Sequence, residues 1–174
     1  MWVVLLVVAM FFWGANWSSA KVVSQWISPH LLVLLRFALT TLLFLPFLWA
    51  KKIRFGVPKG QRMWLALASL FTGFYQWFFF KGLETGLAGT GGVIVTTLNP
   101  CFTFLIIAIL KQHRLSPQEK WGLSIGLSST LFFIQIWQWD VLNLISGGVV
   151  YFFAAALSWS LVTVIAEKIH IHPM

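Results

Sequence analysis

The stretch GLETGLAGTGGVIVTTLNPCFTFLIIAILKQHRL, residues 82–115, decides what kind of fold this chain adopts. It opens with small residues, continues as an apolar run and ends with positive charges, which is the pattern of a membrane helix of about 20 residues. Its small residues predict close packing between the third and fourth helices of the chain. Because Pro100 has no backbone N–H, the carbonyl of Thr96 one turn earlier loses its usual donor, and in hydrocarbon it must face protein or water.

Two interpretations of this irregular centre stay open. Pro100 is either a hinge beside a hydrated cavity, or a simple kink whose freed carbonyl is satisfied by neighbouring threonines.

The composition around this stretch is that of an integral membrane protein. The 174 residues are 59% hydrophobic and 9% charged, which is more apolar surface than one soluble domain of this length buries. The net charge is +8, yet the basic residues lie almost entirely between apolar runs. They therefore indicate membrane topology, and we expect no nucleic-acid partner.

Six apolar runs are long enough to span a bilayer. They cover approximately residues 1–20, 31–50, 63–81, 88–110, 121–139 and 147–166. We therefore predict an all-α fold, a polytopic membrane bundle of six transmembrane helices with short connections. The first run has no positive segment before it and no small-residue cleavage site before Lys21, so we predict a retained helix and no signal peptide.

The positive charges predict the orientation of this bundle. Nine Lys and Arg residues between 51 and 168 fall on one side of the predicted spans, whereas Lys21 and Lys81 fall on the other. Because positive charges concentrate in cytoplasmic loops, we place both termini in the cytoplasm.

Arg36 is the one charge that lies clearly inside a predicted span. It is five residues from the outer end of the second helix, a depth of about 7 Å at the rise of an α-helix. A long side chain at this depth can snorkel to the lipid headgroups, which is one explanation. Asn16, five residues before Lys21, is predicted at a similar depth on the first helix, which favours the wall of a cavity instead.

Several predicted helices carry amide, aromatic or hydroxyl side chains at depth, which suggests a hydrated central pocket. Helix packing explains any one of these hydroxyl groups equally well. The residues that we predict to bind substrate in such a pocket are Trp13, Asn16, Arg36, Tyr75, Gln76, Thr96, Asn99 and Trp159.

The acidic residues are all predicted at helix ends or in loops, so no carboxylate is predicted at mid-membrane, where it could carry protons. We expect Glu84 to pair with either Lys81 or Arg36, and Glu84 and Lys81 to form an outer gate. The histidines lack the helical i, i+4 spacing of a zinc hydrolase. We therefore expect no metal, no cofactor and no enzymatic activity.

These residues resemble those of the drug/metabolite transporter superfamily, specifically its EamA-type repeat. The resemblance covers nearly the whole chain and rests on WGANW at Trp13–Trp17, LLRFALT around Arg36, TTLNP with Pro100, and RLSPQEKWG at Arg114–Gly122. One departure is His113, where family members commonly have Glu. The resemblance implies a transporter in a bacterial inner membrane, with the lipid bilayer and a small molecule as partners. It implies export of small metabolites, such as amino acids or amphipathic compounds, by alternating access.

The resemblance also implies a division of the chain. Residues 1–140 correspond to a first five-helix repeat, and residues 141–174 to the start of a second repeat with a short cytoplasmic tail. Family members have ten helices in two repeats of opposite orientation. We therefore expect either a truncated chain or a six-helix form that dimerises to complete a pathway. A non-transporting fragment, or an assembly partner of such a transporter, is the alternative function.

Overall fold

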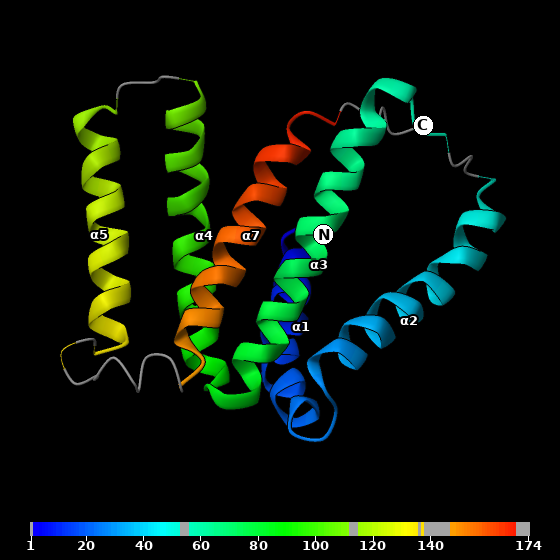
Figure 1. Ribbon diagram of the computed structural model, residues 1–174, viewed down its shortest axis with the longest axis horizontal. Coiled ribbons are helices and arrows are strands. Elements are labelled where there is room, and N and C mark those ends of the chain that lie inside the picture. The colour runs from blue at the N-terminus through cyan, green and yellow to red at the C-terminus, as the bar shows by residue number, and fades with distance from the viewer. Residues whose placement is uncertain (1, 53–55, 112–114, 136, 138–146, 170–174) are drawn as a thin grey trace.

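The computed structural model describes residues 2–52, 56–111, 115–135, 137 and 147–169, and in this part of the chain it is a bundle of six α-helices without strands (Figure 1). The elements are α1 (Trp2–Ser24), α2 (Pro29–Ala50), the 3₁₀ turn η1 (Lys59–Gln61), α3 (Arg62–Thr85), α4 (Ala88–Leu110), α5 (Pro117–Phe133) and α7 (Val149–Ala166). The predicted all-α membrane bundle is confirmed. His113, Asp140 and the end of the predicted 121–139 span lie outside the described residues.

Five helices are long and apolar enough to cross a membrane: α1, α2, α3 with its preceding turn, α4 and α7. The described part of α5 has 17 residues, fewer than the 20 or so that a bilayer requires. Helix α4 has the predicted bounds, 88–110. Helix α3 extends past the predicted residue 81 to Thr85, so Lys81 and Glu84 both lie in its last turns.

The motif RLSPQEK sets the beginning of α5 through local hydrogen bonds. The Ser116 hydroxyl accepts from the Glu119 backbone N–H at 3.3 Å, and the Glu119 carboxylate accepts from the Ser116 N–H at 2.7 Å. This reciprocal pair is a capping box, and Pro117 occupies the first helical position, where its missing N–H costs nothing.

Helix α7 is the centre of the bundle. It packs along both α3 and α4, which make few contacts with each other, and Figure 1 shows it between them. The segment expected to begin a second repeat is therefore part of the packed core. The predicted close approach of the third and fourth helices is wrong, because each of them approaches α7 instead.

Where α7 packs against α3 and α4, a phenylalanine of α7 lies against three glycines. Phe152 is fully buried, and a Cβ atom built on Gly82, Gly86 or Gly91 would lie 2.6, 2.8 or 2.5 Å from its ring. These separations are shorter than van der Waals contact, so a larger residue at any of the three positions would displace the ring. We call Gly82, Gly86 and Gly91 the glycine socket.

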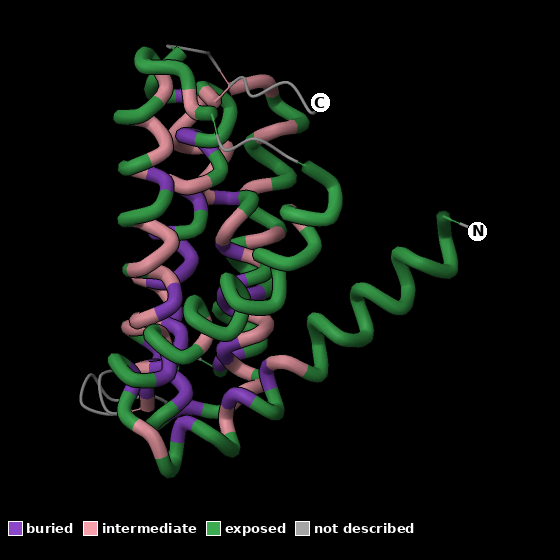
Figure 2. The backbone as a smooth tube through the Cα atoms, turned by 90° about the vertical axis from the view of Figure 1, so that its right-hand side faces the viewer, coloured by how far each residue is buried: buried purple, intermediate pink, exposed green. Residues whose placement is uncertain are grey.

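Burial is concentrated at one end of the bundle. We call this the narrow end; it carries residues 20–32, 82–91 and 147–152, and most of the buried core lies close to it (Figure 2). The opposite, wide end carries residues 50–52, 56–62, 110–111 and 115–117. Towards the wide end α2 leans away from α3 (Figure 1), and α1 is exposed from Trp2 to Trp13. The bundle is thus packed tightly at one end and splayed at the other.

Candidate functional site

The structure distributes the eight predicted substrate-binding residues over four separate places. Arg36, Tyr75, Gln76 and Trp159 lie where α3 meets α2 and α7, which we call the Arg36 group. Trp13 and Thr96 line a groove between α1 and α4. Asn99 contacts α7 from α4. Asn16 is half-buried on α1, one residue before Trp17.

Arg36 projects from α2 onto aromatic rings of α3. Its guanidinium carbon lies 5.8 Å from the ring centroid of Phe79 and 5.9 Å from that of Phe80, which are cation–π distances. Helix α2 begins at Pro29, so Arg36 is about 10 Å along the helix from its start. Within the described residues, no carboxylate lies within ion-pair distance of Arg36. The guanidinium therefore retains donors for an anionic group.

Phe79 connects the elements around Arg36. Its ring lies 4.7 Å from that of Trp17 on α1, 5.0 Å from that of Phe80 and 6.1 Å from that of Tyr75. Tyr75 in turn lies 4.7 Å from Trp159 on α7. Such ring pairs are favourable beyond their buried area, so they fix α1, α3 and α7 relative to one another.

Sequence reasoning missed Trp17 and Phe79 as site residues. The available signal was spacing: Phe79 lies four residues after Tyr75 and three after Gln76, on the same face of α3.

Gln76 presents a buried acceptor without a donor. Its side chain is 8% exposed, and its Oε1 atom has no hydrogen-bond partner within the part of the chain that the structure describes. An unsatisfied buried polar atom costs about 1–3 kcal/mol. Gln76 lies three and four residues before Phe79 and Phe80, and therefore on the face of α3 that Arg36 covers. A molecule that donates a hydrogen bond here would satisfy this atom.

The groove between α1 and α4 has a volume of about 310 Å³. Its lining residues are Trp13, Gly14, Trp17, Ser18, Ala88, Gly89, Gly92, Val93 and Thr96. Thr96 is exposed to the groove side and donates to the Val93 carbonyl at 3.3 Å, so it bonds its own helix. Small residues on both walls leave the indole rings of Trp13 and Trp17 as the largest surfaces.

Asn99 ties α4 to α7 directly before Pro100. The buried Ser160 hydroxyl lies 2.9 Å from the Asn99 backbone carbonyl, 3.0 Å from Asn99 Oδ1 and 2.8 Å from the Ala156 carbonyl. One hydroxyl has one proton, so it shares these acceptors. Pro100 itself lies on the opposite side, in a groove of about 430 Å³ between α4 and α5 that also contains Cys101 and Gly126.

Polar contacts at the narrow end involve the predicted gate residues. Lys81 Nζ lies 2.6 Å from Glu84 Oε2, so of the two partners expected for Glu84 the structure shows Lys81. Lys21 Nζ donates to the Leu83 backbone carbonyl at 2.7 Å, which ties the end of α1 to the end of α3. Among the described residues, no group of three His, Cys, Asp or Glu side chains is close enough together to hold a metal ion.

A known protein family matches most of this chain. The model of the EamA-like transporter family matches residues 1–135, which include α1 to α5 and every predicted site residue except Trp159. Comparisons with curated proteins and with solved structures found no significant match. The family match covers more than half of the chain, and five helices are apolar enough to span a membrane. The protein is therefore a multi-pass membrane protein that belongs to the EamA-like transporter family, within the drug/metabolite transporter superfamily.

Proposed function

We propose that this protein exports small metabolites, such as amino acids or amphipathic compounds, across a cell inner membrane by alternating access. Family membership supports transport as the general activity. The observation that carries the proposal further is the half-buried guanidinium of Arg36, packed on Phe79 and Phe80. The buried Gln76, whose Oε1 has no partner among the described residues, lies one turn earlier on the same helix as these two rings. A cation from α2 that packs on α3, together with an acceptor of α3, suits a small molecule that has both an anionic and a hydrogen-donating group.

In this proposal the Arg36 group binds the substrate. Arg36 attracts a carboxylate, Gln76 accepts a hydrogen bond, and the rings of Tyr75 and Trp159 contact the apolar part of the molecule. Binding pockets of this kind are mostly apolar and contain a few polar groups that fix orientation.

The remaining predicted residues serve the passage of substrate. Trp13, Asn16 and Thr96 line the route on the α1 side, and Asn99 lies at the junction of α4 with α7. Pro100 is the hinge at which α4 bends, and Lys81 with Glu84 forms a gate at the narrow end. The wide end faces the cytoplasm, because most of the described Lys and Arg residues lie there.

The test compares Arg36→Ala and Arg36→Lys with the unchanged protein, purified in detergent. A panel of small carboxylates and their amide analogues is titrated, and the rise in melting temperature reports binding to the folded state. We expect Arg36→Ala to weaken binding of carboxylates at least tenfold and Arg36→Lys to restore part of it, since lysine keeps the charge but loses the planar fork. The control is Lys120→Ala, which removes an exposed charge at the start of α5.

Two outcomes would contradict the proposal. If Arg36→Ala still bound carboxylates as tightly as the unchanged protein, the role of Arg36 would be to reach the lipid headgroups. Failure of the unchanged protein, reconstituted in vesicles, to move any compound that it binds would favour the role of an assembly partner.

A further inference from the structure

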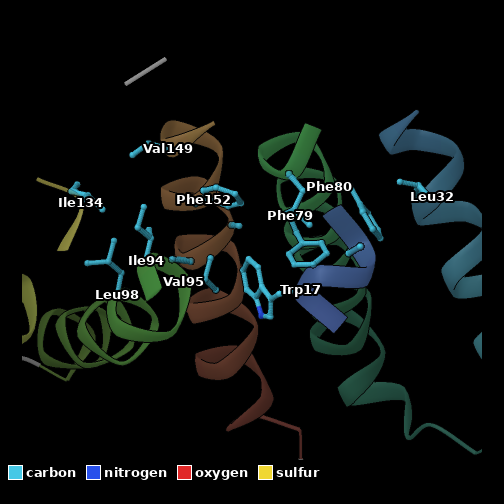
Figure 3. Packing of buried hydrophobic residues seen from close by; sticks show 14 residues of the cluster. Trp17, Leu32, Phe79, Phe80, Ile94, Val95, Leu98, Ile134, Val149 and Phe152 are labelled. Carbon is cyan, nitrogen blue, oxygen red and sulfur yellow. The ribbon is translucent and has the colours of Figure 1, made fainter. Parts of the chain in front are cut away.

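Three aromatic rings from three helices meet at the narrow end of the bundle. Trp17 of α1 lies 4.7 Å from Phe79 of α3 and 6.2 Å from Phe152 of α7, and the three side chains are 6%, 1% and 0% exposed (Figure 3). We call these residues the aromatic plug. We propose that the aromatic plug is a second gate at the narrow end, besides the Lys81–Glu84 pair, and that the structure is the state in which the plug closes the transport path. The inference rests on the proposed function in one respect, that a transport path through the bundle exists.

The plug separates two sets of predicted site residues. One edge of Trp17 lines the groove between α1 and α4, together with Trp13 and Thr96. On its other side Trp17 contacts Phe79, and the guanidinium of Arg36 packs over the Phe79 ring. The rings of Trp17 and Phe79 therefore lie between the α1–α4 groove and the guanidinium of Arg36. Displacement of these rings would join the groove and the Arg36 group into one continuous passage.

From the opposite direction two cavities approach the Arg36 group, one between α2 and α3 and one between α3 and Val57 of the preceding connection. One of about 440 Å³ is lined by Phe37, Leu65, Ala68, Ser69 and Thr72, and another of about 440 Å³ by Val57, Arg62, Leu65, Ala66 and Ser69. Leu65 and Ser69 line both, so the two adjoin and extend from the wide end towards Tyr75. The cavities on the wide side thus lead towards the Arg36 group, whereas on the narrow side packed rings separate that group from the α1–α4 groove. Alternating access requires such an asymmetry of one of its two states.

The glycine socket would allow Phe152 to move away from α3 and α4. The ring rests on Gly82, Gly86 and Gly91, where it meets backbone, and its centroid lies 6.2 Å from that of Trp17. The backbone of Gly148, at the start of α7, has φ +76°, and a Cβ there would collide with the Gly82 carbonyl. Glycine at these positions lets α7 begin directly against α3. A small shift of α7 along this surface therefore moves Phe152 out of the plug without crossing a side chain at the three glycines.

The test measures access to one cysteine from each side of the membrane. The native Cys101 is replaced by serine, and Thr72→Cys places a reporter in the α2–α3 cavity, on the wide side of the plug. Protein in oriented vesicles is treated with a charged, membrane-impermeant methanethiosulfonate from one side or the other. With the plug intact, we expect reaction from the wide end and at least tenfold slower reaction from the narrow end.

Plug variants should remove this difference. Trp17→Ala and Phe152→Ala are expected to raise the rate of labelling from the narrow end at least tenfold. The matched controls, Phe12→Ala on α1 and Leu157→Ala on α7, remove exposed apolar side chains from the same helices and should leave the rate unchanged.

A glycine pair tests the gate with all three rings present. Gly91→Ala places a methyl group 2.5 Å from Phe152 and 2.8 Å from Trp17, whereas Gly89→Ala on the same helix meets nothing within 4 Å. We expect faster labelling from the narrow end for Gly91→Ala alone. If Trp17→Ala fails to fold, as judged by size-exclusion chromatography, Trp17→Phe and the glycine pair decide the question.

Unchanged labelling from the narrow end in Gly91→Ala and in every folded plug variant would overturn the inference and leave the three rings as static core. The labelling needs no substrate, so it is independent of the Arg36 titration. Faster labelling in the plug variants together with unaltered binding by Arg36→Ala would support the gate and reject the proposed binding role of Arg36.

Discussion

Gln76 shows at the scale of one residue how stability and function can diverge. A glutamine oxygen that is buried on a membrane helix without a donor from the protein is destabilising, since lipid tails offer no hydrogen bond. An apolar side chain of similar size would pack in the same place at lower cost.

We therefore predict that Gln76→Leu leaves the melting temperature unchanged or raises it, and weakens ligand binding about tenfold. Thermal unfolding with and without carboxylate ligands measures both quantities. Gln25→Leu, at an exposed position, is the control. A lower melting temperature with unaltered binding would instead make Gln76 a structural residue.

The sequence predicted some of these residues for physical reasons and could not predict others. Arg36 and Gln76 stood out because a polar group at membrane depth is costly wherever it points. Trp17, Phe79 and Phe152 did not stand out, because in this chain aromatic residues also occupy many lipid-facing positions. Their role follows from which helix lies opposite each ring, and that depends on tertiary packing.

Helix α7 shows the same limit at the scale of an element. Its hydropathy is close to that of α2 and α4, yet α7 is far more buried than α2. Lipid tails are as apolar as leucine, so hydropathy identifies a span without indicating whether it faces lipid or protein. Hydropathy therefore predicted the position of α7 along the chain, but not its place between α3 and α4. The small residues of 82–92 did indicate close packing, although their partner is α7.

The hydrogen bonds between Ser160 and Asn99 should contribute to the attachment of α7. We predict that Ser160→Ala lowers the free energy of unfolding by about 1 kcal/mol, near the values known for hydrogen bonds between membrane helices. The control is Ser129→Ala, because the Ser129 hydroxyl donates to Ile125 of its own helix and is exposed. Reversible unfolding in mixed micelles gives the difference, and equal stability of the two variants would contradict this role.

At the scale of the whole molecule, the family match and the packed core have different boundaries. The match ends at residue 135, whereas eight buried residues of the bundle come from α7. Residues 1–135 contain the helices α3 and α4, but not the surface on which both are packed.

We predict that removal of residues 141–174 greatly lowers the fraction of protein that is monodisperse in detergent. The reason is that the buried faces of α3 and α4 would lack a partner. Removal of residues 170–174 alone is the control. Size-exclusion chromatography compares the two forms, and co-expression of residues 147–174 as a separate segment should restore the stable species. A well-folded form of 1–140 would show that α7 is dispensable for the core.

The central place of α7 bears on how the protein is made. The ribosome delivers α3 and α4 to the bilayer before α7 exists, so both helices must wait there without the neighbour that later covers them. Final assembly is then an event that follows insertion, and a delay in synthesis between residues 135 and 149 would lengthen the period in which quality-control proteases can recognise the unfinished bundle.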